Sequence, residues 1–154
     1  MGREIERKFL ADRFPHSTCS GGIRFKQGYL PTAGNVVVRV RCGGGRGYLT
    51  IKGPLEGGGR DEFEYPIPEQ DAEEILQRLC TSSIIDKTRY RVTFDEAQWD
   101  VDVFHGENEG LVIAEIELQD IHQEFRRPSW VGAEVTDDPR YLNVNLARDP
   151  YSTW

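Results

Sequence analysis

The sequence is poor in basic residues and has no long apolar run. Its 154 residues contain 19 Lys and Arg against 26 Asp and Glu, which gives a formal net charge of −7. A binder of nucleic acid or of an anionic membrane needs a basic surface, and a membrane-spanning helix needs about 20 apolar residues in a row. Residues 1–20 also lack the apolar core of a signal peptide. We therefore expect a cytoplasmic protein without nucleic-acid or membrane partners.

Cysteine is scarce, and its spacing excludes the usual cysteine-based sites. Cys19, Cys42 and Cys80 are odd in number and widely separated, so they form no CxxC pair of the kind that binds zinc or acts as a redox couple. The motif GxxxxGK followed by Ser or Thr, which cradles phosphates at the start of a helix, is also absent. A phosphate site in this chain must therefore be built differently.

The dominant pattern in the sequence is the alternation of apolar and polar residues. Apolar and polar residues alternate with the period of two that places successive side chains on opposite faces of a strand. Glycine-rich stretches separate consecutive strands, as antiparallel hairpins require, and the length suits a single domain over residues 1–154. We predict an α+β fold built on a closed, tunnel-like antiparallel β-barrel of eight strands, near residues 2–9, 23–30, 36–42, 47–53, 60–67, 87–94, 97–104 and 111–118.

Three stretches are predicted to be helical and to flank this barrel. From Glu69 to Cys80, apolar residues recur at the spacing of one helix face, and Pro68 suits the start of that helix. A shorter helix is expected from Asp120 to Arg127. A third should begin at Asp138-Pro139, where a capping Asp precedes a proline in the first helical position.

The polar positions of the predicted strands are almost all charged. Within one strand the charges recur at spacing two and share a face, and acidic and basic pairs are segregated by strand: Glu4, Glu6 and Lys8; Arg39 and Arg41; Lys52; Glu62 and Glu64; Lys87, Arg89 and Arg91; Asp100 and Asp102; Glu115 and Glu117. This face is either solvated, as in an ordinary amphipathic sheet, or it points inward and lines a charged lumen. Buried charges require an opposite charge, a metal or a charged ligand, so a charged lumen implies a function.

The residue types on this face suggest which ligand a charged lumen would take. Clustered carboxylates are hard oxygen ligands that suit Mg²⁺ or Mn²⁺, and these ions usually bridge to the phosphates of a substrate. Pairs of Arg and Lys suit several phosphate groups, because Arg offers a fork of donors and Lys a point charge. Together they describe a linear polyphosphate bound with a divalent metal.

The N-terminal residues Glu4-Ile5-Glu6-Arg7-Lys8 form an ExExK motif, followed by the apolar pair Phe9-Leu10. Seven further elements follow in order along the chain: Gln27-Gly28-Tyr29-Leu30, the Arg39/Arg41 pair, Thr50-Ile51-Lys52, Glu62-Phe63-Glu64, Lys87-Thr88-Arg89-Tyr90, Asp102-Val103-Phe104 and Glu115-Ile116-Glu117. This order resembles the CYTH superfamily, also called triphosphate tunnel metalloenzymes, over nearly the whole chain.

The resemblance implies a tunnel-like eight-stranded barrel that binds a triphosphate and metal ions. The positions that match the family's metal-side carboxylates are Glu4, Glu6, Asp102, Glu115 and Glu117, with Glu64 as an addition. Those that match its phosphate-binding basic residues are Lys8, Arg39, Arg41, Lys52, Lys87 and Arg89. Tyr29 and Glu62 match weaker positions, and Arg91 extends the basic run without a defined place in the tunnel.

The chain looks most like the short bacterial members that resemble inorganic triphosphatases. The resemblance therefore implies hydrolysis of tripolyphosphate to pyrophosphate and phosphate with Mg²⁺ or Mn²⁺. Glu4, Glu6 and Lys8 are the catalytic candidates, and Lys8 either acts as a general base or only binds phosphate. Three alternatives stay open: a thiamine triphosphatase, an adenylyl cyclase on the same barrel, and a non-catalytic polyphosphate-binding module.

A barrel that is polar inside has an apolar outside that must be covered. The apolar residues assigned to this outer face are Val38, Val40, Ile51, Val101, Val103, Ile116 and Leu118. Two or three short helices are too few to cover all of them, and a homodimer would bury the remainder.

Overall fold

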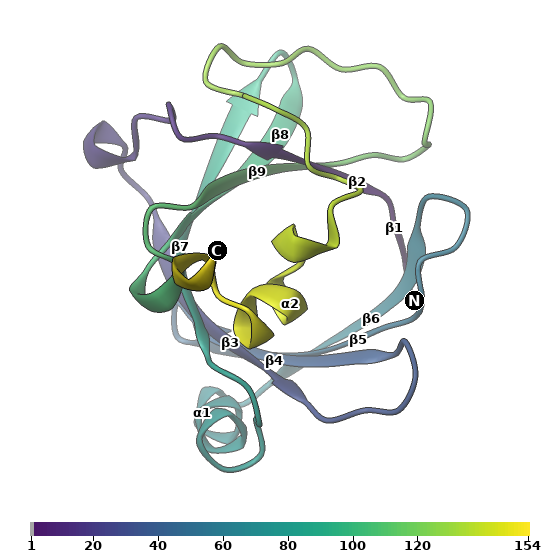
Figure 1. Ribbon diagram of the computed structural model, residues 1–154, viewed down its shortest axis with the longest axis vertical. Helices are drawn as coiled ribbons and strands as arrows, with labels where there is room; N and C mark the ends of the chain where they lie inside the picture. Colours follow the sequence, from purple (N-terminus) through teal and green to yellow (C-terminus); the bar gives the residue numbers. More distant parts are fainter. Residues whose placement is uncertain (1) are drawn as a thin grey trace.

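The computed structural model describes residues 2–154 as an antiparallel sheet that curls into a nearly closed barrel (Figure 1). Within these residues the sheet has nine strands, in the order β1-β6-β5-β4-β3-β7-β8-β9-β2. Their bounds are β1 (Gly2–Glu4), β2 (Glu6–Leu10), β3 (Ile23–Leu30), β4 (Val37–Gly43), β5 (Arg46–Lys52), β6 (Arg60–Ile67), β7 (Ile85–Phe94), β8 (Ala97–Phe104) and β9 (Val112–Glu117).

The N-terminal strand closes the barrel by changing partners. β1 pairs with β6, with Glu4 opposite Arg60, whereas β2 pairs with β9, with Glu6 opposite Glu117. Only Ile5 separates the two strands, so the two edges of the sheet are joined by a continuous stretch of chain. The sequence predicted this stretch as one of eight strands; the structure divides it at Ile5, which raises the count to nine.

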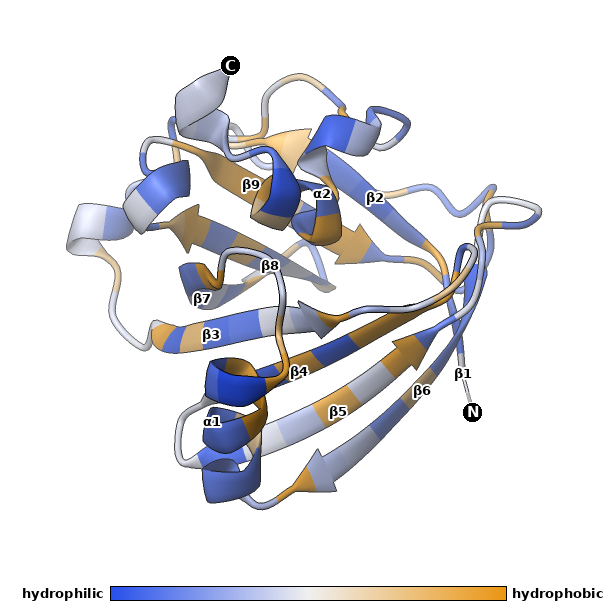
Figure 2. Ribbon diagram, turned by 60° about the horizontal axis from the view of Figure 1, so that its bottom comes forward, coloured by the Kyte–Doolittle hydropathy of each residue, from blue (hydrophilic) through white to orange (hydrophobic). Residues whose placement is uncertain are grey.

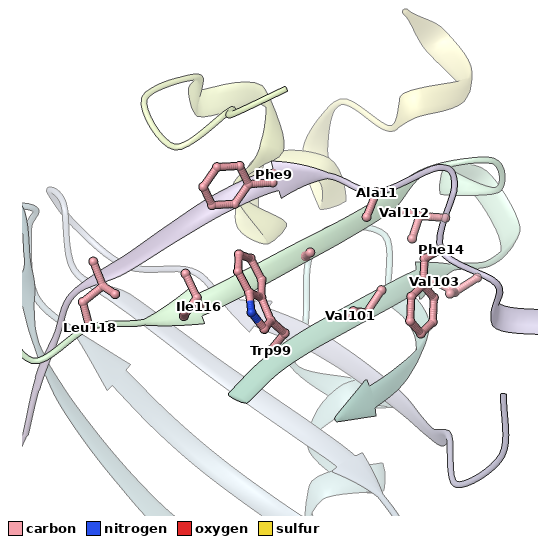
Figure 3. Packing of buried hydrophobic residues seen from close by; sticks show 10 residues of the cluster. Phe9, Ala11, Phe14, Trp99, Val101, Val103, Val112, Ile116 and Leu118 are labelled. Carbon is pink, nitrogen blue, oxygen red and sulfur yellow. The ribbon is translucent and has the colours of Figure 1, made fainter. Parts of the chain in front are cut away.

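The outer faces of β2, β9 and β8 carry the largest apolar cluster. Figure 3 shows Phe9, Trp99, Val101 and Ile116 on this face. Phe125 and Trp130 of the segment that follows β9 pack against this cluster. The rings of Phe9 and Trp99 meet edge to face with centroids 5.7 Å apart. Burying an apolar side chain of this size contributes about 1.5–3 kcal/mol, so this cluster holds one wall of the barrel together.

The segment that covers this cluster is irregular, and the helix predicted from Asp120 to Arg127 is wrong. Instead, the backbone N–H of His122 donates to the Asp120 carboxylate at 2.8 Å, and the Gln123 side chain accepts from the backbone of Gln119 at 2.8 Å. Such local side-chain bonds compete with the helical hydrogen-bond pattern. Phe125 nevertheless packs on the apolar cluster, so burial is achieved without a helix.

The helix α1 (Glu69–Arg78) lies outside the barrel against β4 and β5 (Figure 2). Its predicted start is confirmed, and it ends two residues before the predicted Cys80. Ala72 and Leu76 form a buried cluster with Val40 of β4. Figure 2 also shows hydrophobic and hydrophilic residues alternating along the strands, which is the basis of an apolar exterior and a charged interior.

The C-terminal segment crosses one end of the barrel (Figure 1). The single helix predicted from Asp138-Pro139 is interrupted: a 3₁₀ turn over Pro139–Tyr141 is followed by α2 (Asn143–Arg148), because Leu142 has an extended backbone. Pro139 does follow an Asp cap, as predicted. Leu146 and Ala147 anchor α2 in a second apolar cluster that includes Ile85, Phe104 and Ile113.

Three more 3₁₀ turns complete the described elements, over His16–Thr18, Gly106–Asn108 and Tyr151–Thr153. None of the helices formed by residues 2–154 combines the length and the hydrophobicity that crossing a bilayer requires.

Candidate functional site

The barrel encloses a cavity of about 780 Å³, which we call the lumen. Each of the nine strands contributes at least one polar side chain to its wall. Among the predicted site residues, those that line the lumen are Glu4, Glu6, Lys8, Arg39, Arg41, Lys52, Glu64, Lys87, Arg89, Glu115 and Glu117. The charged faces of the strands therefore point inward. Of the two interpretations of the sequence, a solvated outer face or a charged lumen, the structure agrees with the charged lumen.

The strand register brings opposite charges together across neighbouring strands. Lys8 on β2 lies opposite Glu115 on β9, with Nζ 3.3 Å from the carboxylate. Lys52 on β5 lies opposite Glu62 on β6, again at 3.3 Å. Directly opposed side chains are the closest neighbours in a sheet, so the alternation of the sequence together with this register generates these ion pairs.

One part of the lumen has an excess of carboxylates. Glu6 and Glu117 lie directly opposite each other on β2 and β9, and like charges in this position destabilise a sheet. Burial, followed by the proximity of Glu4, Glu62 and Glu6, raises the pKa of Glu117. We call Glu4, Glu6, Glu62 and Glu117 the acidic cluster. Within residues 2–154 Glu117 forms no ion pair, so this cluster has room for an added cation.

Glu4 is the member of the acidic cluster with the most cationic contacts. Its carboxylate lies 2.8 Å from Lys52 Nζ and 3.5 Å from Arg60 Nε. Its Oε2 atom, the oxygen of both ion pairs, is buried and accepts no well-aligned hydrogen bond within the described residues, so these contacts are chiefly electrostatic. Arg60 was not among the predicted site residues, although it shares the period-two face of Glu62 and Glu64 and could have been found from that pattern.

Another part of the lumen has an excess of cations. Arg41 donates from Nε to the Gln27 side chain at 3.0 Å and forms no ion pair with a carboxylate of residues 2–154. Burial, together with the positive charges of Arg39 and Arg89, lowers the pKa of Arg41 to about 9. Arg39 has a buried Nε without a hydrogen-bond partner in this part of the chain. Arg39 and Arg41 therefore keep N–H donors that an anion in the lumen could accept from.

Lys87 and Arg89 share the carboxylate of Asp102 beside these arginines. Lys87 Nζ donates to Asp102 Oδ2 at 2.8 Å, and Arg89 Nε donates to Oδ1 at 2.7 Å. Lys87 is 1% exposed and Asp102 is fully buried. Burial lowers the pKa of Lys87, and the neighbouring Arg89 and Arg41 lower it further against the opposing effect of Asp102. We call Arg39, Arg41, Lys87 and Arg89 the basic cluster.

The surroundings of Lys8 do not favour the role of a general base. That role required cationic neighbours, but the structure places two carboxylates beside the ammonium, Glu115 at 3.3 Å and Glu6 at 3.6 Å. Burial alone would lower the pKa of Lys8, but the two carboxylates more than offset it and raise the pKa well above that of an ordinary lysine. Lys8 therefore carries a proton at neutral pH.

Four positions named from the sequence can now be placed more exactly. Asp102 does not line the lumen; it is fully buried, and its two oxygens accept hydrogen bonds from Lys87 and Arg89. Arg91, whose place was undefined, lines the lumen, where its guanidinium meets Asp100 at 3.0 Å. Tyr29 and Glu62 line it as well. Asn143 of α2 also lines the lumen, and no pattern in the sequence pointed to it.

The acidic cluster fits a divalent cation that completes its coordination from elsewhere. Within residues 2–154 no three carboxylate, histidine or cysteine side chains converge closely enough to form a ready metal cage. Mg²⁺ and Mn²⁺ do not need one, because in phosphate-processing sites they are held by one or two carboxylates together with water and substrate oxygens. The carboxylate oxygens of Glu4, Glu6 and Glu117 have the hard donor chemistry for this arrangement.

Comparisons with known proteins agree with this geometry. Two curated inorganic triphosphatases are similar to this chain. The one from Acetivibrio thermocellus is 48% identical over 154 residues, which is 100% of this chain and 99% of the relative. The one from Nitrosomonas europaea is 37% identical over 149 residues, which is 94% and 96% of the two chains. A solved inorganic triphosphatase structure matches with a TM-score of 0.68 and 33% identity, covering 94% of this chain and 97% of the other.

The family profile described as the CYTH domain matches residues 2–151. With this match, the full-length similarity to the curated relatives and the charged barrel described above, the chain belongs to the CYTH domain family.

Proposed function

We propose that this protein is a triphosphatase that hydrolyses inorganic tripolyphosphate to pyrophosphate and phosphate with the help of Mg²⁺ or Mn²⁺. The names of the full-length relatives support the substrate. The observation that carries the proposal is the lumen itself, in which an acidic cluster without enough cations lies in the same cavity as a basic cluster without enough anions. A triphosphate bound with a divalent cation supplies both missing charges.

The basic cluster would hold the phosphates. Arg39 and Arg41 would donate to non-bridging oxygens through their guanidinium forks, which suit phosphate geometry. Lys52, Lys87 and Arg89 would neutralise further charge along the chain of phosphates. Because these donors are fixed by strands and shielded from bulk water, they would stabilise the charge of the transition state without costly rearrangement.

The acidic cluster would hold the metal. Glu4, Glu6 and Glu117 would supply its protein oxygens. Glu115 and Glu64 also line the lumen, where they pair with Lys8 and Arg39. When bound, the divalent ion neutralises phosphate charge and lowers the pKa of coordinated water. Asp102, although it matches a metal-side position of the family, would act here as the counterion that keeps Lys87 and Arg89 in place.

The reaction needs a water molecule that attacks the terminal phosphorus while the bond to the bridging oxygen breaks. Pyrophosphate leaves with that oxygen, and the proton of the water passes to the phosphate products or to a base. Lys87 would keep its proton while Asp102 holds its ammonium at 2.8 Å, and would bind phosphate. Lys8 remains charged beside Glu115 and Glu6 and would bind phosphate.

Phosphorus NMR of tripolyphosphate tests the proposal directly. Purified protein with Mg²⁺ or Mn²⁺ should yield equal amounts of pyrophosphate and phosphate, and EDTA should stop the reaction. Glu4→Gln should lower the rate by orders of magnitude, whereas Glu73→Gln, on the exposed surface of α1, should leave it unchanged. Equal turnover with EDTA would overturn the metal requirement.

The same assay separates the alternatives on one barrel. Thiamine triphosphate and ATP are tested beside tripolyphosphate, with identification of products, so that a thiamine triphosphatase and an adenylyl cyclase are both distinguished. A protein that binds tripolyphosphate tightly without turnover under any metal condition would be a polyphosphate-binding module, and the proposed activity would then be wrong.

A further inference from the structure

Two uncharged amides lie within the basic cluster, one on β3 and one on α2. Gln27 is fully buried, and Asn143 is the first residue of α2 and lines the lumen. The Gln27 side chain donates from Nε2 to Asn143 Oδ1 at 3.3 Å. The two amides are 116 positions apart in the sequence, so only the folded barrel joins them.

Each amide oxygen accepts a hydrogen bond from one cation of the basic cluster. Gln27 Oε1 accepts from Arg41 Nε at 3.0 Å, and Asn143 Oδ1 accepts from Lys87 Nζ at 3.0 Å. A continuous hydrogen-bonded path therefore runs from Arg41 through Gln27 and Asn143 to Lys87. Both ends of this path are positively charged, and its two central residues are neutral.

The contacts fix which way both amides point. Gln27 must direct its oxygen to Arg41, because its nitrogen donates to the Tyr29 hydroxyl at 2.9 Å as well as to Asn143. Asn143 must direct its oxygen inward, because both of its partners there are donors. Because each amide has only one allowed orientation, it holds its hydrogen-bond partners in defined positions. The bonds to Arg41 and Lys87 are also stronger than bonds between neutral groups, because the donors are charged.

Lys87 shows what this arrangement achieves. An ammonium has three N–H donors; one is taken by Asp102 at 2.8 Å and one by Asn143 at 3.0 Å. The two acceptors come from β8 and α2 and restrict the rotation of the ammonium. The remaining donor is then available to a phosphate oxygen in the lumen, which Lys87 lines.

The attachment of α2 does not depend on Asn143. Leu146 and Ala147 are buried in the apolar cluster, the backbone oxygen of Ala147 accepts from Ser83 N at 3.2 Å, and Asn145 Nδ2 donates to the oxygen of Pro139 at 2.7 Å. The amide of Asn143 thus faces the basic cluster while other residues of α2 hold the helix, which separates its role from packing.

We propose that Gln27 and Asn143 form an amide bridge that positions Arg41 and Lys87 for binding the phosphates of the substrate, so that α2 completes the phosphate site of the barrel. Both amides are positioning residues in this scheme. The inference rests on the proposed function only for the choice of anion, because the contacts of the bridge are independent of hydrolysis.

The test is a double-mutant cycle on anion binding in the intact chain. Isothermal titration with tripolyphosphate in EDTA gives the Kd for the wild type, Gln27→Leu, Asn143→Leu and the double variant. Each single variant should bind about tenfold more weakly, the effect of losing a hydrogen bond to a charged group. Because the two amides act through one path, the double variant should lose much less than the product of the two single effects.

Gln77→Leu is the matched control, since it replaces an amide with leucine at an exposed position of α1 outside the bridge. It should bind tripolyphosphate like the wild type. Asn143→Ser, which keeps a short acceptor, should restore part of the affinity and provides a second variant if leucine impairs folding. In turnover with Mg²⁺, Asn143→Leu should raise KM and lower kcat, whereas Gln77→Leu should change neither.

The outcomes separate this inference from the proposed function. The bridge would be overturned if Kd were unchanged in both single variants, or if the loss of affinity in the double variant equalled the product of the two single losses. It would also be overturned if the wild type did not bind tripolyphosphate. If the wild type binds tripolyphosphate without hydrolysing it under any metal condition, the proposed activity fails. The bridge would then still stand or fall by the pattern of Kd values alone.

Discussion

At the scale of single residues, the lumen combines paired charges with a few that have no partner. Lys52 and Lys8 are satisfied by carboxylates across the sheet, whereas Glu117 and Arg41 are not. Arg41 is desolvated by burial, and Glu117, although exposed, lies beside three other carboxylates, so each charge costs stability unless a ligand compensates it. Residues of this kind are typical of positions where a protein gives up stability for binding, and in the proposed function they lie where the metal and the phosphates would bind.

Glu117 allows this trade-off to be measured. Its pKa is raised by burial and by Glu4, Glu62 and Glu6, so its ionised form destabilises the metal-free protein at neutral pH, and that cost disappears as the pH falls below the raised pKa. Glu117→Gln should therefore raise the melting temperature in EDTA at pH 7 while lowering triphosphatase activity by orders of magnitude.

Calorimetry of both proteins with and without Mg²⁺ provides the control for Glu117. The ion should stabilise the wild type more than Glu117→Gln. A variant with a lower melting temperature than the wild type in EDTA would show that the carboxylate is compensated in the metal-free protein.

At the scale of elements, a glycine in the sheet determines how closely the helix α1 approaches the barrel. Gly47 of β5 lies under α1, where an added Cβ would come within 2.9 Å of the Ala72 Cβ and of the Ile67 oxygen. A strand residue with a side chain would push the helix outward. The close packing of α1 on Val40 and its neighbours thus depends on a glycine of β5.

Gly47→Ala should consequently destabilise the fold. We expect a loss of about 1–3 kcal/mol in the free energy of unfolding, as for other overpacked positions. Gly53→Ala is the matched control, because the nearest atom to its added Cβ is an Asp61 carbon at 3.8 Å, an ordinary contact. Urea unfolding of both variants checks the difference, and equal stability would show that α1 shifts without cost.

The segment after β9 is attached to β2 by an ion pair that should respond to acid. Arg7 Nε donates to Glu134 at 2.7 Å, and this bond lowers the pKa of Glu134 to about 2, against the opposing effect of burial. A depressed carboxyl pKa contributes stability above the unfolded value near 4.5, and this contribution is lost as the pH falls from there toward 2.

Glu134→Gln should therefore flatten the decline of stability between about pH 4.5 and 2. The variant should also be less stable than the wild type at pH 7, because the charge-assisted bond to Arg7 is gone. Melting temperatures measured across this pH range give the comparison. Parallel curves for the two proteins would mean that other carboxylates dominate acid unfolding.

At the scale of the whole molecule, the barrel places the charges inside and the apolar residues outside. Of the residues assigned to the outer face, Val40 is covered by α1, and Val101, Val103, Ile116 and Leu118 are covered by the irregular segments around Phe14, Phe125 and Trp130. Val38 and Ile51 are only partly buried. The homodimer thus stays a prediction, now limited to the face of β4, β5 and β6, where Tyr65 is 52% exposed.

Light scattering of Tyr65→Lys beside the wild type tests this prediction. A charge at an exposed position in the centre of an interface should convert a dimer to a monomer, since unpaired interfacial charges are costly. A wild type that is already monomeric at micromolar concentration would contradict the dimer.

The two opposite charge clusters also predict how ligands stabilise the complete protein. Mg²⁺ alone and tripolyphosphate alone in EDTA should each raise the melting temperature, because each compensates one cluster. A ligand at 100 times its Kd should add about 2.7 kcal/mol. Scanning calorimetry measures both effects, with sodium sulfate at equal ionic strength as the control for the anion. No effect of tripolyphosphate beyond that of sulfate would count against a specific phosphate site.

The sequence by itself determined the strands and the face on which each charge lies, because a period of two is a local property of the backbone. That is why Lys87, Arg89 and Glu115 could be assigned to the charged face from the sequence, and why Arg60 could have been; that this face lines a tunnel was implied by the resemblance to the CYTH family. The start of α1 was equally accessible, since apolar spacing and a proline define it locally. The helix expected at residues 120–127 was wrong because side-chain hydrogen bonds and tertiary burial overrode the local pattern.

Only the tertiary structure decided which charges are paired and which are left for a ligand. Partner choice depends on register and on barrel closure at Ile5, and these bring together residues from distant strands. The occupied carboxylate of Asp102, the uncompensated charges of Glu117 and Arg41, and the amide of Asn143 beside Lys87 are all products of that closure. A sequence pattern records the face of a side chain, whereas the electrostatic balance of a site depends on distances that exist only once the barrel has formed.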